Sequence, residues 1–406
     1  MDNKNNIPAL RFPGFSGEWE EKTLGEICKI AEDKCDSDYL DISTYISTEN
    51  MLQDYGGIRQ AANLPSSGSY TQFSKGDVLF SNIRPYLKKV WQAEFDGTAS
   101  NDVVVFHASE PYNSAFVSHV IKNSRFIEYS MVGAKGLKMP RGDKKQMMEY
   151  IFSIPSSPSE QQKIASFLSE VDALISAQSQ KVDALKERKK GLMQQLFPQP
   201  GETVPRLRFP GFEGEWEEAP LSHFLFEHKT KSDGKCEVHS VSVSKGVINQ
   251  VEYLGRSFAA TDTSKYNLAK PNDIIYTKSP TGDFPYGIIK QNKNPYNVIV
   301  SPLYAVYTPA SKYLGYMLDS YFESPTNTYN YLYSLIQKGA KNTIQISNDT
   351  FVSKKIRLPE DEKEQEKIAS LLSSLDDLIA SETAKADSLK AMKKGLMQQM
   401  FPQPAK

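Results

Sequence analysis

Hydrophobic positions recur at alternating spacings of four and three residues in two segments of the chain, 160–200 and 364–404. A repeat that averages 3.5 residues is typical of helices that pair in a coiled coil. Each segment then reaches Phe-Pro, at 197–198 and at 401–402, where proline ends a helix. We therefore expect helical spacers over 158–197 and 359–401. The predicted seam residues are Ile164, Leu168, Val171, Ile175, Val182, Leu185, Leu192, Ile368, Leu372, Leu375, Ile379, Leu389 and Leu396.

Two helices of about 36 residues would each be roughly 54 Å long. They most simply pair with each other, and the long segment between them makes antiparallel pairing natural. Polar residues interrupt the seam at matching places, Gln178 with Glu382 and Lys189 with Lys393. Such residues select one register or contact a partner. Alternatively, they lie near the surface and the lysines extend their ammonium groups to water.

The chain is a duplication. The helical segments begin as EQQKIASFL at 160–168 and EQEKIASLL at 364–372, and a second pair of copies reads LRFPGFSGEWEE at 10–21 and LRFPGFEGEWEE at 207–218. A period of about 200 residues is too long for a solenoid, so whole domains are repeated. We expect a circular arrangement in which a pseudo-twofold axis relates the halves and the chain ends lie near one another.

Between the copies, residues 28–152 and 225–357 hardly resemble each other, yet both alternate short strands with one or two helices. Strands are predicted at 77–81, 101–106, 273–277 and 301–307, and helices at 115–126 and 312–322. The fold class is therefore α+β, with two β-rich domains over 1–157 and 198–358, joined by the helical spacers as an antiparallel coiled coil.

The net charge is −1, but charge is unevenly distributed. Residues 225–357 hold 16 Lys and Arg against 10 Asp and Glu, and 122–145 holds seven basic and two acidic residues, so basic faces are possible on a neutral chain. Three cysteines argue for a reducing cytoplasm and against a disulfide framework. No apolar run approaches a membrane span, so we expect a cytoplasmic protein with no membrane contact.

Basic loops that follow the predicted strands are the candidate binding surfaces. Arginine and lysine bind phosphates or guanine edges, asparagine binds adenine, and interleaved tyrosines suit nucleic acid. For any single residue, the alternative is an ordinary solvated charge. The DNA-binding candidates are Asn82, Arg84, Tyr86, Lys88, Lys89, Lys135, Lys138, Arg141, Lys144, Lys278, Tyr286, Lys290, Lys338, Lys341 and Asn342.

Motifs of common catalytic sites are missing from the sequence. There is no phosphate-binding GxxxxGK[ST], no HExxH metal pair and no GxSxG elbow, and the five histidines do not cluster at ligand spacing. Asn294-Pro-Tyr296 resembles a methyltransferase motif with one proline too few, and it fits a turn. We predict no catalytic residues and no metal site, which favours a recognition subunit over an enzyme.

The whole chain resembles HsdS, the specificity (S) subunit of type I restriction–modification systems. The resemblance rests on both LRFPGFxGEWEE boxes, GDVLF at 76–80 with NDIIY at 272–276, both EQxKIASxL boxes, and the KKGLMQQ-(Leu/Met)-FPQP ends at 189–200 and 393–404. It implies two target recognition domains, each for one half of a split, asymmetric site in double-stranded DNA, with the helices as a ruler between them.

The resemblance also implies partners. Two methyltransferase (M) subunits would dock on the helices, and restriction/translocase (R) subunits would join the complex. S-adenosylmethionine would belong to M, and ATP and Mg²⁺ to R, so that adenine methylation and ATP-dependent cleavage are activities of the assembly. The competing class is a duplicated coiled-coil scaffold that binds only proteins.

Overall fold

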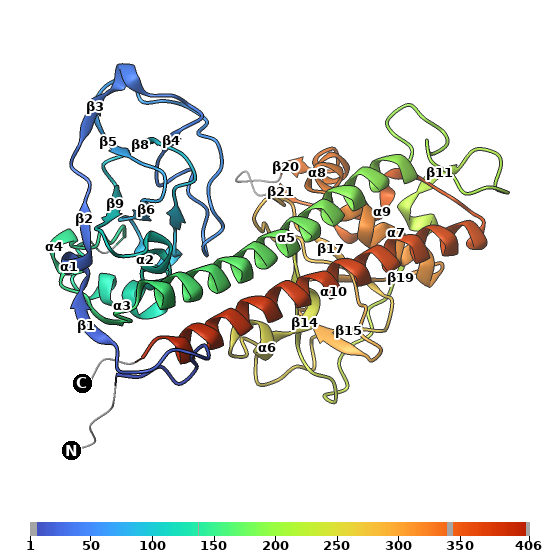
Figure 1. The fold of residues 1–406 in the computed structure, drawn as a ribbon. Helices are drawn as coiled ribbons and strands as arrows, with labels where there is room; N and C mark the ends of the chain where they lie inside the picture. Colours follow the sequence, from blue (N-terminus) through green and yellow to red (C-terminus); the bar gives the residue numbers. More distant parts are fainter. Residues whose placement is uncertain (1–5, 137, 339–343, 403–406) are drawn as a thin grey trace. The chain divides into compact units, whose positions relative to one another are not determined.

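The computed structural model describes residues 6–136, 138–338 and 344–402. The chain forms two compact units, one of residues 1–181 and 382–406, and the other of residues 182–381. The unit boundaries fall in the middle of two 39-residue helices, α5 (Pro158–Leu196) and α10 (Glu362–Met400) (Figure 1). Each unit therefore combines one β-rich domain with half of each long helix.

An antiparallel four-stranded sheet of the same strand order lies in each β-rich domain: β2-β9-β6-β7 in the first and β12-β19-β16-β17 in the second. The common fold expected of the two divergent segments is thus confirmed. The strands are β2 (Cys28–Ile30), β6 (Val78–Ser81), β7 (Val90–Gln92), β9 (Val103–Ala108), β12 (Leu225–Glu227), β16 (Ile274–Tyr276), β17 (Ile289–Gln291) and β19 (Ala305–Pro309).

The remaining sheets differ between the units. The first unit has a second four-stranded sheet of order β3-β5-β8-β4, whereas the second has separate two-stranded pairs, β13-β14, β15-β18 and β20-β21. Their bounds are β3 (Lys34–Asp36), β4 (Tyr45–Ile46), β5 (Ser69–Phe73), β8 (Gly97–Ala99), β13 (His239–Ser242), β14 (Gly246–Asn249), β15 (Asn267–Ala269), β18 (Val298–Val300), β20 (Gln337–Lys338) and β21 (Ile344–Gln345).

A buried aspartate fixes the start of the equivalent strands β6 and β16. The Asp77 carboxylate accepts a hydrogen bond from the Ser74 backbone N–H (2.9 Å), and that of Asp273 accepts one from the Lys270 N–H (2.6 Å). Each aspartate also contacts a histidine side chain of its own sheet region, at 2.7 and 2.9 Å. A short polar side chain that satisfies the backbone of its own turn explains why an Asp directly precedes both strands.

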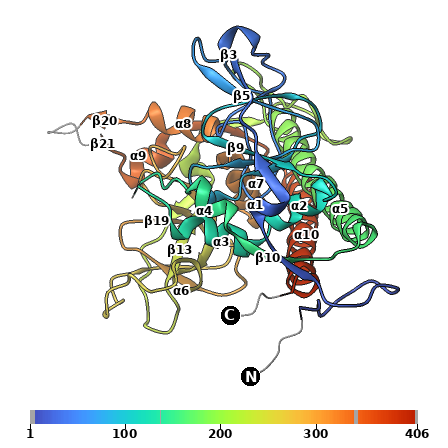
Figure 2. The same cartoon turned by 60° about the vertical axis from the view of Figure 1, so that its left-hand side comes forward.

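Short helices cover the sheets: α1 (Leu24–Ile27), α2 (Ser114–Ile121), α3 (Ser124–Val132), α4 (Lys144–Met148), α6 (Gln250–Leu254), α7 (Lys312–Phe322), α8 (Pro325–Tyr333), α9 (Asn348–Ser353), and the 3₁₀ turns η1 (Ser37–Tyr39), η2 (Pro85–Leu87) and η3 (Leu221–His223). The helix predicted over 115–126 is wrong as one element. The segment forms two helices, because the Asn123 side chain accepts a hydrogen bond from the Arg125 N–H and so caps the start of a new helix, α3. Within the first unit, α2 lies beside α5, where His119 contacts Ser169 (Figure 2).

The repeated boxes form an identical joint in each unit. Strand β1 (Glu20–Thr23) pairs with β10 (Ile151–Ile154), and β11 (Glu217–Pro220) pairs with β22 (Lys355–Leu358). Arg11 donates two hydrogen bonds to Glu160 at the start of α5, at 2.7 and 2.8 Å. Arg208 does the same to Glu364 at the start of α10, at the same distances.

The opposite helix ends complete these joints in the circular order expected from the sequence. In the first unit, the Leu10 N–H donates to the Gln399 carbonyl near the end of α10; in the second, Leu207 donates to Gln195 near the end of α5, both at 3.0 Å. The Trp19 ring meets Phe401 edge to face, and the Trp216 ring meets Phe197 likewise. Each opening box therefore bridges the start of one long helix and the end of the other.

The predicted seam residues face inward. Six are buried and seven are half-buried. The buried ones are Ile164, Leu168, Val171, Val182, Ile368 and Leu372. Ile164 and Leu168 belong to the core of the first unit, together with Met397 and Met400 of α10. No helix among the described residues is long and apolar enough to cross a membrane.

The polar seam residues pair across the helices, which run antiparallel within each unit. Gln178 donates to the Glu382 carboxylate (2.6 Å), Lys393 pairs with Asp172, and Lys189 pairs with Asp376 (2.6 Å). Glu382 also binds Lys181 and Lys385, both at 3.0 Å. These contacts support the register interpretation, because a slip of either helix would leave buried charges without partners.

Glu382 predicts an acid-dependent loss of helix pairing. Its hydrogen bonds with Gln178, Lys385 and Lys181 lower the pKa of this carboxyl to about 2. A lowered folded-state pKa stabilises the fold above the ordinary value near 4.5, and this stabilisation is lost as the pH falls from there to about 2. We expect Glu382→Gln to lower the melting temperature at pH 7 and to make little difference near pH 2, measured by circular dichroism. An equal deficit at both pH values would contradict this assignment.

Candidate nucleic-acid interface

Two basic loops that the sequence analysis singled out separately lie together in the first unit. The Arg84 N–H donates to the Pro140 carbonyl (2.8 Å), and the Gly142 N–H donates to the Asn82 carbonyl (3.2 Å). Ile83 and Arg141 form a β-bridge between the loops. Residues 82–89, 135–136 and 138–144 therefore make one composite surface, although about 50 residues separate the two loops in the chain.

The first of these loops is held in an unusual backbone conformation. Arg84 and Lys88 have positive φ values of 51° and 52°, and so do Asp54 and Tyr55 in the adjoining loop, at 51° and 62°. The two loops are joined by hydrogen bonds from the Asp54 N–H to Leu87 and from the Tyr55 N–H to Lys88, both at 3.0 Å. Non-glycine residues in the left-handed region cost energy and concentrate at functional sites.

The composite surface carries exposed cations and an aromatic side chain. Lys135, Lys138 and Lys144 are exposed, and Tyr86 is 49% exposed. The Arg141 side chain is 58% exposed and its guanidinium lies 3.0 Å from Asp102. Lys88 lies 3.4 Å from Asp54, also near the surface. Exposed ion pairs of this kind are weak, so the cations remain available to a polyanion.

Two candidates in the first unit lie inside rather than on this surface. Asn82 is 8% exposed and its backbone joins the two loops, and a DNA contact of its side chain stays a prediction. The Lys89 ammonium donates to the Thr48 carbonyl (2.6 Å), and partial burial lowers its pKa. Both residues brace the loop from which Arg84, Tyr86 and Lys88 extend.

In the second unit, the loop after β16 is braced at the corresponding place. Lys278 has a positive φ of 62° and donates to the Asn348 amide oxygen, while burial lowers the pKa of its ammonium. The Asn348 amide donates in turn to Glu227 (2.6 Å). A left-handed basic residue after the Asp-led strand is thus a shared feature of both units.

Tyrosines form the exposed surface next to this loop, and sequence reasoning identified only one of them. The Tyr286 ring lies 5.5 Å from that of Tyr329 and 6.3 Å from that of Tyr333, which themselves stack at 5.2 Å. Tyr329 and Tyr333 are 40% and 57% exposed. Their spacing of four residues was the signal that could have identified them, because within a helix, here α8, it places both rings on one face.

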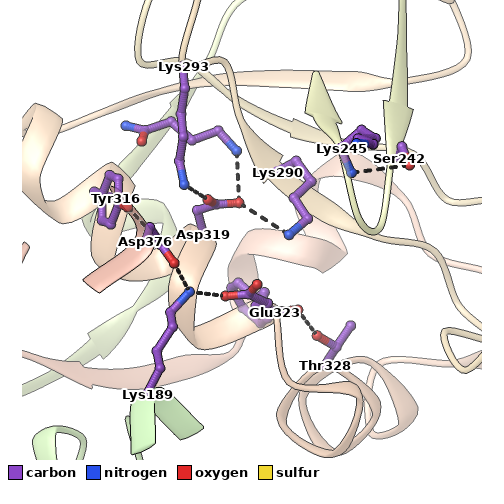
Figure 3. Close-up of polar contacts among 12 residues, drawn as sticks. Lys189, Ser242, Lys245, Lys290, Lys293, Tyr316, Asp319, Glu323, Thr328 and Asp376 are labelled. Carbon is purple, nitrogen blue, oxygen red and sulfur yellow. Dashed lines mark hydrogen bonds and ion pairs between the residues drawn. The ribbon is translucent and has the colours of Figure 1, made fainter. Parts of the chain in front are cut away.

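Lys290 is buried rather than part of the exposed surface, and its contact with DNA stays a prediction. It is 7% exposed, and its ammonium lies 3.8 Å from Asp319, which also binds Lys293 at 2.7 Å (Figure 3). Burial of a lysine beside a carboxylate is a structural arrangement that the residue type alone does not reveal.

The same polar network attaches α7 to both long helices within the second unit. Lys189 of α5 binds both Glu323, the residue that directly follows α7, and Asp376 of α10, each at 2.6 Å (Figure 3). The hydroxyl of Tyr316 on α7 also donates to Asp376, at 2.6 Å. The two carboxylates around Lys189 raise the pKa of its ammonium, against the effect of burial. Lys189 therefore attaches the β-rich domain to α5 and also sets the register between α5 and α10.

Three candidates of the second basic loop are not placed. Lys341 and Asn342 lie outside the described residues, and Lys338 is described only as the end of β20.

The candidate surface has the properties of a binding site for a polyanion. It offers arginine, lysine and tyrosine on rigid, backbone-linked loops, as nucleic-acid contacts require. Neither Cys28 nor Cys236 suggests a nucleophile, since burial raises the pKa of Cys28 to about 12 and that of Cys236 above its ordinary value.

Comparisons with known proteins agree with this arrangement. The family model of the type I restriction modification DNA specificity domain matches residues 16–187 and 229–391. The S subunit of a type I restriction–modification system from M. genitalium, solved as a crystal structure, aligns over 98% of this chain and 100% of its own, with a TM-score of 0.61 and 13% identity. No curated protein matches the chain.

Two further solved structures align with lower scores. One, described as part of a type I R-M system in a study of complex assembly and conformational transition, covers 96% of this chain and 98% of its own, at 18% identity and a TM-score of 0.49. The HsdS subunit from Thermoanaerobacter tengcongensis covers 96% of each chain, at 16% identity and a TM-score of 0.38. Because the family model matches both halves and most of the sequence, the chain belongs to the family of type I restriction–modification DNA specificity subunits.

Proposed function

We propose that this chain directs a type I restriction–modification complex to a bipartite DNA site, with each β-rich domain recognising one half. This proposal rests on the fact that the two units share their joints and sheet order but differ in the side chains at their surfaces. The first presents Arg141 and exposed lysines, whereas the second presents three tyrosines beside Lys278. Two β-rich domains that share a fold but differ in their exposed loops are suited to a DNA site whose two halves differ in sequence.

Partner subunits would bind the outer faces of the long helices. Leu174 of α5 and Leu378 of α10 occupy equivalent positions of the repeat, and both are exposed, at 58% and 41%. Exposed leucines at matching places on two helices favour two copies of one partner. We propose that these are methyltransferase subunits, that they supply the S-adenosylmethionine site, and that restriction subunits supply the ATP and Mg²⁺ sites.

In this proposal the chain itself is not catalytic and acts in the cytoplasm. Adenine methylation and ATP-dependent cleavage belong to the assembled complex. A scaffold that binds only proteins would not need different basic and aromatic loops beside the left-handed residues of both units.

The direct test is methylome sequencing of cells that express this chain with its cognate methyltransferase subunit, compared with cells that express the methyltransferase alone. We expect a split motif, with methyladenine in both halves, only when this chain is present. Exchange of residues 225–357 for those of a related subunit should change one half of the motif. A stable complex that methylates no new motif would contradict the proposal and favour a protein-binding scaffold.

Substitutions on the two surfaces should affect different halves of the site. Arg141→Ala should weaken binding by about 1–3 kcal/mol and relax base preference in one half only, as for loss of an arginine contact to a base edge. Tyr333→Ala is the matched variant and should affect the other half. The measurement is binding of the complex with methyltransferase to duplexes that carry single base changes in either half. Equal loss of base preference in both halves with Arg141→Ala would refute the assignment.

Lengthening both helices tests whether they set the gap between the half-sites. A heptad inserted after Lys181 and another after the equivalent Lys385 keep the seam in phase and add about 10.5 Å. At roughly 3.4 Å per base pair, the methylated motif should gain about three unread base pairs with both half-sites unchanged. A heptad in one helix alone is the control, because it breaks the antiparallel register. An unchanged gap in the double insertion would disprove the spacing role.

A further inference from the structure

Three potential metal ligands converge at the joint of the second unit, away from the basic loops. Glu217 lies on β11, His223 ends η3, and Glu360 follows β22 just before α10. One ligand atom from each lies within 4.8 Å of the others, and Glu217 Oε2 is 3.6 Å from His223 Nε2. Residues far apart in the sequence are thus brought together by the β11–β22 pairing, in which Glu217 faces Leu358.

The negative charge at this cluster is not neutralised by the described part of the chain. Neither Glu217 nor Glu360 forms an ion pair with a lysine or arginine among the described residues, and Glu217 Oε2 is shielded from solvent without accepting a hydrogen bond. Two adjacent carboxylates favour uptake of a proton or a cation between them.

The first unit has its own cation at the equivalent place. There the strand reads EEKT, and the Lys22 ammonium lies 3.7 Å from Glu20 and 3.9 Å from Glu26. The second unit reads EEAP, so that Ala219 replaces the lysine. His223 stands where the first unit has Glu26, and Glu360 stands where it has Ser156. The second unit has therefore lost the internal ammonium and gained an imidazole and a further carboxylate.

We propose that Glu217, His223 and Glu360 bind a divalent transition-metal ion of the Zn²⁺ type. Tetrahedral ligands at about 2.0–2.2 Å from Zn²⁺ lie about 3.3–3.6 Å apart, close to the separation of Glu217 and His223. The imidazole selects Zn²⁺, Co²⁺ or Ni²⁺ over Mg²⁺ and Ca²⁺, which prefer oxygen ligands. The bound ion would fasten β11 and η3 to the segment that begins α10.

Metal titration of the purified full-length chain tests this site. After treatment with EDTA and its removal, Zn²⁺ is titrated in competition with a chromophoric chelator, in a variant with Cys35 and Cys236 changed to serine to exclude thiol binding. We expect one equivalent of Zn²⁺, with at least a tenfold weaker affinity in His223→Ala and in Glu360→Gln. Both side chains are exposed, so neither change disturbs packing, which circular dichroism verifies.

The matched control is Glu20→Gln, at the position of the first unit that corresponds to Glu217, and it should leave the Zn²⁺ affinity unchanged. The site is overturned if the chain binds no Zn²⁺, or if the bound equivalent survives both His223→Ala and Glu360→Gln. It is supported further if Co²⁺ gives visible absorption bands that disappear in His223→Ala. None of these outcomes depends on DNA recognition by the chain.

Discussion

The joint between each opening box and a long helix depends on one buried, two-pronged ion pair. Glu160 and Glu364 are 2% and 1% exposed, and each is satisfied by an arginine about 150 residues away in the sequence. Removing one partner of such a buried pair costs about 3–5 kcal/mol, because the remaining charge has no water. The next residue, Gln161 or Gln365, donates to the carbonyl of Pro155 or Pro359. The repeated Arg and Glu-Gln therefore position helix, strand pair and β-rich domain together.

Beyond these joints, the two units attach their domains to the helices by different charges. In the second, Lys189 lies between two carboxylates, Asp376 and Glu323. In the first, the equivalent pair of Lys393 and Asp172 meets a second cation, Lys122, 3.6 Å from Asp172. Lys122 and Glu323 both stand directly before the residue that caps the next helix. A domain exchanged between such chains must therefore bring along a charge that suits its helical seam.

The sequence predicted the repeated and periodic parts of the structure well, and the individual contacts poorly. Heptad spacing locates α5 and α10 because burial imposes a period on a helix, and the two Asp-led strands follow from the local turn chemistry of Asp77 and Asp273. The basic loops were recognised separately, but their union through Arg84 and Pro140 depends on tertiary pairing. The internal ion pair of Lys290 was not foreseen for the same reason, since it depends on the position of Asp319 on another element.

The joints and long helices, called the frame here, differ from the exposed loops in where their charged side chains find partners. Within the frame, Arg11, Glu160 and Glu382 have partners in the same unit, so little of their interaction energy depends on what the loops contain. The left-handed residues Arg84 and Lys278 lie instead in the loops that follow the central sheet strands β6 and β16. Sequence can then change at the exposed Tyr86 or Tyr333 without disturbing the joints. Because the buried charges of the joints and long helices pair with one another, the two recognition surfaces can diverge independently.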